Sequence, residues 1–272
     1  MWKEFVKKRV YSLLTKTLKR AAKEQGLNGL VSDLEKIVPN ITEQYSLFKV
    51  NTPYLRSKIR NMHAFQISLV DKIVRGFKEP AIVDIGDSSG THLQYLKRLY
   101  PGVKCLSVNL DAGAVAKIRE KGLEAINTRA ENLCNHNIRT DIFLCFEIFE
   151  HLMNPCKLFY DLSSKTNAKY LIVTVPYLKR SRVGLHQIRV ESKRVMTAEN
   201  VHILELSPKD WKLLALFSGW RVTSEEFYLQ YPKRHWLRIT KPYWKRKDFE
   251  GFWGAILEKD TSASDRYQDW ES

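Results

Sequence analysis

Residues 81–99, AIVDIGDSSGTHLQYLKRL, constrain the fold of this chain more than any other stretch. An apolar run through Val83 and Ile85 enters a glycine turn, Gly86 to Gly90, and a segment with helical apolar spacing leaves it. The order of strand, glycine turn and helix is typical of the cofactor loop of a doubly wound α/β sheet. Glycines let a ligand approach the backbone, and the start of a helix offers N–H groups that have no partner within the helix.

Two carboxylates in this loop, Asp84 and Asp87, indicate the charge of the ligand. A dinucleotide brings a pyrophosphate, which these acids would repel, and the turn reads G-x-S-x-G instead of G-x-G-x-x-G. A P-loop is excluded because no Gly-Lys-Ser/Thr follows. S-adenosylmethionine carries an ammonium and a sulfonium group, so it suits the loop better than NAD. The alternative is an ordinary strand-to-helix turn with a serine as the helix N-cap.

Further strands are predicted downstream, over residues 103–110, 124–127, 170–175, 220–228 and 252–257, with another that begins at Asp141. The second strand ends beside Asn109 and Asp111. That position is about 20 residues beyond the loop, where such folds place a ribose-binding side chain.

At this point the chain resembles the class I S-adenosylmethionine-dependent methyltransferases. The motifs that carry the resemblance are the loop DIGDSSG, the polar end of the second strand, AENL at 130–133 and EIFEHL at 147–152. The resemblance covers about residues 60–260. It implies an α/β fold with a doubly wound seven-stranded sheet, mostly parallel with an antiparallel edge strand, here preceded by an N-terminal helical extension.

The resemblance also implies where the cofactor would bind. The expected cofactor-binding residues are Asp84, Gly86, Asp87, Gly90, Asn109, Asp111, Ala130, Glu131 and Phe146. Ser88 replaces the family's middle glycine, and Asn109 replaces the acid that meets the ribose. An amide binds hydroxyls less strongly than an ionised acceptor, and Asp111 is the residue that could compensate. A relative without catalysis is the alternative.

The segment E-x-x-E-H after the fourth strand, together with a later histidine, carries the catalytic prediction. Some members of the family, ubiquinone-pathway O-methyltransferases and small-RNA 3′-terminal 2′-O-methyltransferases, use this pattern as a divalent metal site. The resemblance therefore implies that Glu147, Glu150, His151 and His202 bind Mg²⁺, Mn²⁺ or Zn²⁺. In members without metal, His151 is a general base beside Glu150, or both residues are structural. Three other histidines are expected to be incidental: His63, His92 and His136.

The net charge of +15 is concentrated in three segments. Residues 1–25 carry +6, residues 178–194 carry +5 and residues 232–250 carry +5, so the remainder is close to neutral. Segregated charge favours an anionic partner, although solvated surfaces are the alternative. Within 1–25, apolar residues recur at helical spacing among lysines and arginines, which is typical of a basic amphipathic helix on an anionic membrane. Packing of that helix on the core or a second subunit is the other interpretation.

The predicted organisation is an N-terminal helical extension over 1–60, a methyltransferase domain over 61–260 and a polar tail over 261–272. Residues 177–203 and 229–251 are expected as insertions on the substrate side. The four cysteines are scattered, and no apolar run is long enough to cross a membrane. We expect a cytoplasmic protein, with attachment to the inner face of a membrane through residues 1–25 as an extension of that prediction.

The function predicted from these patterns is S-adenosylmethionine-dependent methylation of oxygen on an anionic small-molecule, lipid-linked or sugar acceptor. Two alternatives stay open. One is an RNA-end 2′-O-methyltransferase, in which nucleic acid is the partner. The other is a non-catalytic, methyltransferase-like binding module.

Overall fold

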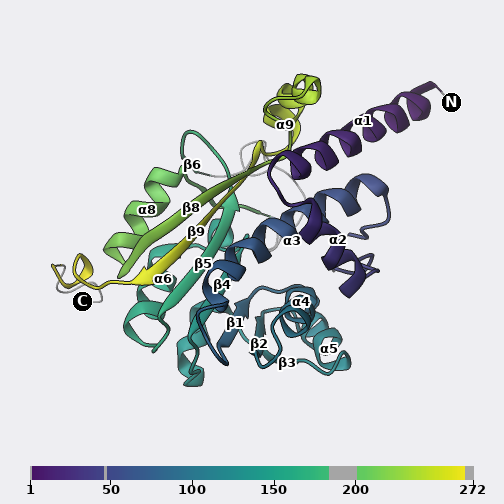
Figure 1. Cartoon of the computed structure of the whole chain (residues 1–272). Helices are drawn as coiled ribbons and strands as arrows, with labels where there is room; N and C mark the ends of the chain where they lie inside the picture. The colour runs from purple at the N-terminus through teal and green to yellow at the C-terminus, as the bar shows by residue number, and fades with distance from the viewer. Residues whose placement is uncertain (1, 46–47, 184–200, 267–272) are drawn as a thin grey trace, which may run out of the picture.

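A computed structural model describes residues 2–45, 48–183 and 201–266 of the chain. Within them, seven strands form one sheet in the order β3-β2-β1-β4-β5-β9-β8 (Figure 1). The strands are β1 (Ala81–Ile85), β2 (Lys104–Asn109), β3 (Glu124–Asn127), β4 (Ile142–Phe146), β5 (Tyr170–Pro176), β8 (Trp220–Leu229) and β9 (Gly251–Lys259). The antiparallel strand is β9, which pairs with β5 on one side and with the edge strand β8 on the other. The predicted doubly wound sheet is confirmed.

Helices cover both faces of this sheet. One face packs against α3 (Pro53–Val74), α4 (Thr91–Leu99) and α5 (Ala112–Glu120). The other packs against η1 (Ala130–His136), α6 (Pro155–Ser164) and α8 (Pro208–Phe217). Alternation along β1 follows from the period of a strand, because Ile82 joins the first core while Val83 and Ile85 join the second. Asp84 therefore points toward the α3–α4 side.

The N-terminal extension consists of α1 (Trp2–Glu24) and α2 (Asn28–Ile37), followed by α3. Leu14 and Leu18 of α1 pack against Tyr54 and Trp244. The predicted boundary between residues 60 and 61 falls inside α3, whose N-terminal part binds the extension. There the buried guanidinium of Arg60 donates hydrogen bonds to the backbone of the α2 region and to the hydroxyl of Tyr95 in α4.

The two predicted insertions differ in how much of each is described. Residues 229–251 hold η3 (Trp236–Thr240) and α9 (Lys241–Lys247), and η3 packs against α1. From the other insertion, β6 (Arg182–Val183) pairs with β7 (Leu204–Glu205), and residues 184–200 lie outside the described part. The predicted polar tail contains η4 (Ser264–Arg266), with 267–272 outside it. No helix in the described ranges has the length and apolarity to cross a membrane.

Candidate functional site

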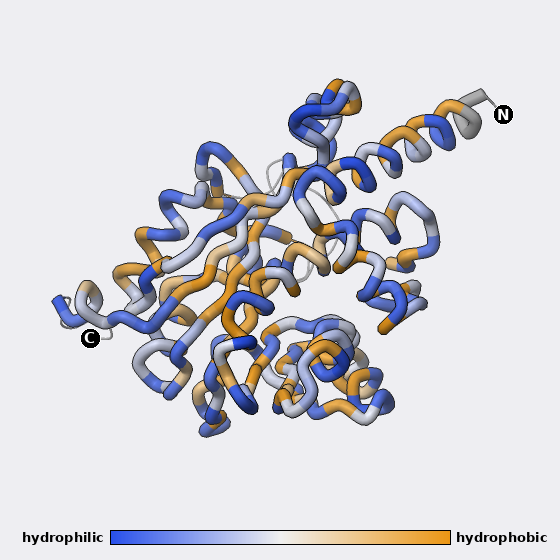
Figure 2. Tube along the Cα trace, viewed as in Figure 1, coloured by the Kyte–Doolittle hydropathy of each residue, from blue (hydrophilic) through white to orange (hydrophobic). Residues whose placement is uncertain are grey.

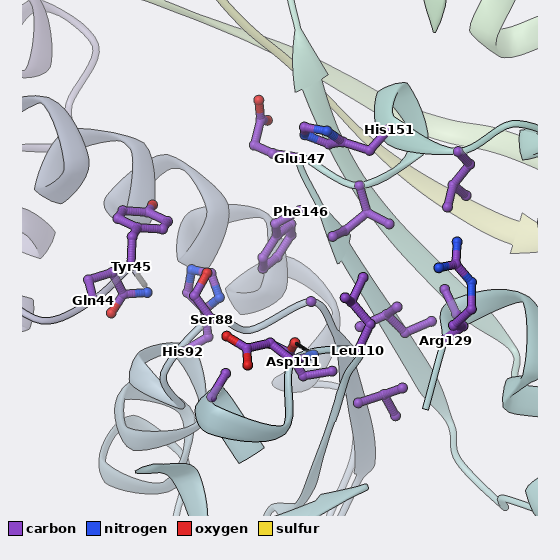
Figure 3. Close-up of a pocket in the computed structure, with 18 of the residues that line it drawn as sticks. Gln44, Tyr45, Ser88, His92, Leu110, Asp111, Arg129, Phe146, Glu147 and His151 are labelled. Atoms are coloured by element: carbon purple, nitrogen blue, oxygen red, sulfur yellow. Dashed lines mark hydrogen bonds between the residues drawn. The ribbon is translucent and has the colours of Figure 1, made fainter. Parts of the chain in front are cut away.

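A cavity of about 270 Å³ opens at the carboxyl ends of β1, β2 and β4 (Figure 3). The carboxyl ends of parallel strands meet at one edge of a sheet, so loops that are distant in sequence come together there. Residues after each of these strands line the cavity, and α3 contributes Met62 and Gln66. The glycine turn after β1 thus forms one wall of this cavity.

Several of the predicted cofactor-binding residues line this cavity: Gly86, Asn109, Asp111, Ala130, Glu131 and Phe146. Asn109 uses both ends of its amide within the protein. Its Nδ2 donates to the carbonyl oxygen of Asp87 at 3.4 Å, and its Oδ1 accepts from the backbone N–H of Asp111 at 2.9 Å. Asp111 caps α5 through Oδ1, which accepts from the backbone N–H of Gly113 at 2.8 Å. The second carboxylate oxygen of Asp111 is the acceptor that this corner offers to a ligand.

The other predicted cofactor-binding residues, Asp84, Asp87 and Gly90, lie beneath the loop and not among the lining residues. The carboxylate of Asp87 accepts from backbone N–H groups at the start of α4. Gly90 has a φ of +76°, and a Cβ there would lie 3.0 Å from Cδ1 of Leu123. These residues shape the loop from below, by capping a helix and by letting α4 pack closely.

His92, which was expected to be incidental, lines the cavity and joins these two acids. Its Nδ1 lies 3.1 Å from Oδ2 of Asp84, and its Nε2 lies 3.1 Å from Oε1 of Gln66. Both partners offer an oxygen that accepts, and this arrangement favours the doubly protonated ring. Burial alone would lower the pKa of His92, but its hydrogen bond to Asp84 and the charges of both acids raise it. No local sequence pattern predicted this buried cluster of titratable groups.

Burial and neighbouring charges also shift the pKa values of Asp87 and His63 in this cluster. Burial, and then the neighbouring Asp84 carboxylate, raise the pKa of Asp87 to about 6. His63 packs edge-on against His92 with ring centroids 4.8 Å apart. Burial and the charge of His92 hold the pKa of His63 well below its usual range, so this second ring is neutral.

The N-terminal extension supplies a wall of the cavity that sequence reasoning missed. Gln44, Tyr45 and Phe48 line it, and the Tyr45 and Phe48 rings stack with centroids 4.9 Å apart. Oε1 of Gln44 accepts hydrogen bonds from the hydroxyls of Ser89 and Thr91, which ties the extension to the glycine turn. These residues belong to no motif, and only the packing of the extension brings them to the site.

His151 lines the cavity, and the structure places Glu150 and His202, which do not line it, next to this histidine. One ligand atom from each lies within 4.8 Å of the others. Nδ1 of His151 donates to the carbonyl oxygen of Val201 at 3.0 Å, and Nδ1 of His202 lies 3.1 Å from the Glu205 carboxylate. Glu150 is fully buried, and burial together with the neighbouring carboxyl group of Glu147 raises the pKa of Glu150 well above its usual range. Three of the four residues predicted to bind a metal thus lie near one another, and whether they bind one stays a prediction.

Solved structures with similar folds were found, although no protein-family model and no curated protein matches this sequence. One is the 1,6-didemethyltoxoflavin-N1-methyltransferase of Burkholderia thailandensis, with a TM-score of 0.52 and 11% identity over 74% of this chain and 78% of that one. Another is an O-methyltransferase from a multienzyme of Brevibacillus brevis, with a TM-score of 0.50 and 12% identity over 75% and 74%. Both were solved with S-adenosylhomocysteine. The chain has the class I methyltransferase fold.

The same fold also serves other chemistry. The cyclase SpnF matches with a TM-score of 0.56 and 12% identity, over 85% of this chain and 93% of that one. Activity on the class I methyltransferase fold therefore has to be argued from the residues of the site.

Within this methyltransferase fold, Glu147 separates from the predicted metal-binding group and lines the cavity. Its φ of +56° turns the chain sharply after β4, and its backbone N–H donates to the carbonyl oxygen of Thr174 at 2.8 Å. Burial raises the pKa of Glu147 to about 8, although its hydrogen bonds with Thr174 and Glu150 lower it in part, as does the charge of Lys58. A bound cation would favour the ionised form of this carboxyl group.

Proposed function

We propose that this protein transfers a methyl group from S-adenosylmethionine to an acceptor hydroxyl. The observation that carries the proposal is a cavity with the glycine turn at one wall and His151 at the other, with three carboxyl groups among its lining residues: Asp111, Glu131 and Glu147. These carboxyl groups give the cavity acceptors for the hydroxyl and amino groups of this methyl donor and a negative charge that matches its positive one. The apolar lining around Leu110 and Phe146 suits an adenine ring.

The residues present fit the donor in a definite assignment. Gly86 and Ser88 would meet its methionine part, and Ala130 with Glu131 would lie beside its adenine. Asp111, rather than Asn109, would bind the ribose hydroxyls, because the Asn109 amide is already hydrogen-bonded at both ends. An ionised carboxylate is also the stronger acceptor.

The chemistry required of the protein is alignment and removal of one proton. The acceptor oxygen attacks the methyl carbon, the carbon–sulfur bond breaks, and S-adenosylhomocysteine leaves with the electron pair on sulfur. Nδ1 of His151 carries a proton, since its partner Val201 offers a carbonyl oxygen that can only accept. Nε2 is then the basic nitrogen of the neutral ring, and it can receive the hydroxyl proton.

We further propose that Glu150, His151 and His202 bind a divalent cation. Burial and the neighbouring Glu147 raise the pKa of Glu150, and a cation at this point would favour its ionised form and give its oxygens a partner. Each histidine donates its Nδ1–H to a fixed acceptor, which is how proteins orient metal-binding imidazoles. Two imidazoles and one carboxylate favour Zn²⁺ or Mn²⁺ over Mg²⁺. His151 would then be a ligand instead of the base, and the chemistry that a bound cation would supply is a lower pKa of the acceptor hydroxyl.

The acceptor would approach from the side of the 229–251 insertion. Phe249 from this insertion stacks on the His202 ring, with centroids 5.4 Å apart and planes 12° apart. Lys58 bridges to Asp248 of the same insertion, and its charge reaches Glu147. Together with the basic composition of this segment, these contacts support an anionic small-molecule, lipid-linked or sugar acceptor.

The donor assignment is tested by calorimetry with S-adenosylhomocysteine. Asp111→Asn should weaken binding by about tenfold, because the charged acceptor is lost. Asp265→Asn, an exposed acid in η4, is the matched control and should bind as the unchanged protein does. Absence of binding by the unchanged protein would refute the proposal and favour the non-catalytic module.

The cation is tested separately by titrating Zn²⁺ and Mn²⁺ into metal-free protein and following thermal stability. Glu150→Gln and His202→Asn should abolish the metal-dependent rise in Tm, while His136→Asn, at an exposed histidine, should keep it. An equal rise in all variants would refute the cation site. His151 would then stay assigned as the base.

Methyl transfer to RNA ends, measured beside phenolic and sugar acceptors, decides between the acceptor classes.

A further inference from the structure

Helix α1 is covered by the rest of the protein along only part of its length. Its inner half packs against the body through Leu14, Thr17 and Leu18, all buried. Val6 and Val10 continue this apolar stripe toward the N-terminus at helical spacing, but they are 42% and 41% exposed. Figure 1 shows this half of α1 running out from the body, and Figure 2 shows its apolar positions.

A second exposed apolar group lies in η3, the element of the 229–251 insertion that packs against α1. Trp236 is 68% exposed and Ile239 is 73% exposed, whereas Leu237 between them is buried and anchors the turn. Trp236 and Ile239 of η3, and Val6, Val10 and Leu13 of α1, are exposed apolar side chains on two elements that pack together, and we call them jointly the α1–η3 surface. Its apolar members come from two segments that are more than 200 residues apart in the sequence.

The charges around the α1–η3 surface are mainly positive, although Glu24 lies where the two segments meet and accepts from the backbone N–H groups of Lys233 and Arg234. Residues 6–23 carry seven lysines and arginines and no acid, and residues 233–247 also carry seven and no acid. Apolar side chains flanked by cations match the two layers of a lipid bilayer surface, which are an apolar interior and anionic headgroups. Tryptophan side chains are enriched at that boundary.

We propose that the α1–η3 surface docks this protein on an anionic membrane surface. The aliphatic members decide against nucleic acid as the partner, because Val6, Val10 and Ile239 have no ring with which to stack on a base. The excess of positive charge decides against a second copy of the chain, since two such surfaces would repel each other. The proposal stands independently of the methyltransferase activity.

Flotation of the full-length protein with vesicles tests the proposal. The protein should float with mixed phosphatidylcholine–phosphatidylglycerol vesicles and not with phosphatidylcholine alone. Trp236→Ala/Ile239→Ala should weaken partitioning by about tenfold or more, because two apolar side chains no longer enter the lipid. Leu213→Ala, at an exposed leucine of α8 on the far part of the sheet, is the matched control and should partition normally.

The charge contribution is tested with Lys7→Gln/Lys8→Gln, which should weaken partitioning by about fivefold for each lysine removed. Lys209→Gln/Lys212→Gln on α8 is its control and should have no effect. Equal flotation with neutral vesicles, or normal partitioning of the Trp236/Ile239 variant, would overturn the proposal. It would also be overturned by RNA binding that depends on the lysines alone, or by a dimer that the Trp236/Ile239 variant dissociates.

Discussion

Replacement of Gly86 by alanine should destabilise the protein through one identifiable contact. Gly86 has a φ of +89°, and a Cβ built on it would lie 2.1 Å from Cδ1 of Ile148 and 3.0 Å from Cγ1. Ile148 follows β4, so the glycine is needed where the first cofactor turn meets the fourth strand's loop. A longer side chain such as arginine meets the same obstruction, so Gly86→Arg should also lower the stability of the fold.

Two costs add for Gly86→Ala. A non-glycine residue in the left-handed region costs about 1–2 kcal/mol, and forcing a methyl group into a packed site costs about 1–3 kcal/mol. The expected loss of unfolding free energy is therefore about 2–5 kcal/mol. Ile148→Ala removes both obstructing atoms. In that background, only the backbone part of the Gly86→Ala cost should remain. The two changes should then be non-additive by about 1–3 kcal/mol.

Urea unfolding of the four proteins in the cycle, followed by circular dichroism, measures this coupling. Calorimetry with S-adenosylhomocysteine on the same samples separates a lost fold from a lost site. Additivity of the two changes within about 0.5 kcal/mol would refute the steric argument.

Three further predictions concern the site and its support. His151→Ala should lower kcat more than about 100-fold, with affinity for S-adenosylhomocysteine nearly unchanged; near-normal turnover would make this residue structural. The pKa of Asp87 is raised from 3.8 to about 6 in the folded protein. The folded protein therefore loses stability as the pH rises from about 4 through 6, because the unfolded chain ionises this group first. Asp87→Asn should therefore gain stability over the unchanged protein, by about 3 kcal/mol at pH 7 and almost nothing at pH 4, and a difference that does not change with pH in unfolding curves would contradict the assignment. Arg60→Ala should cost about 3 kcal/mol or more in urea unfolding, since it leaves buried carbonyl oxygens and the Tyr95 hydroxyl without their donor, and a cost under about 1 kcal/mol would contradict this.

Much of the fold could be predicted from local sequence. Alternation in β1, the glycine turn and the Ser207-Pro208 start of α8 depend on residues adjacent in the chain, so the sequence displays them directly. The same holds for Asp111 and Phe146, which stand at or just after strand ends and therefore at the site. Strand periodicity and helix caps are short-range effects, and short-range effects can be recognised without a structure.

The sequence by itself determined the sheet, the cofactor loop and the residue types available for methyl transfer. Tertiary structure decided which of those residues share one space. It placed His92 between Asp84 and Gln66, and it brought the Gln44 segment over the glycine turn. It also placed Glu150 next to His202, which is distant from it in the sequence. It also left the outer half of α1 uncovered. These outcomes depend on burial and packing between distant segments, and no local pattern records them.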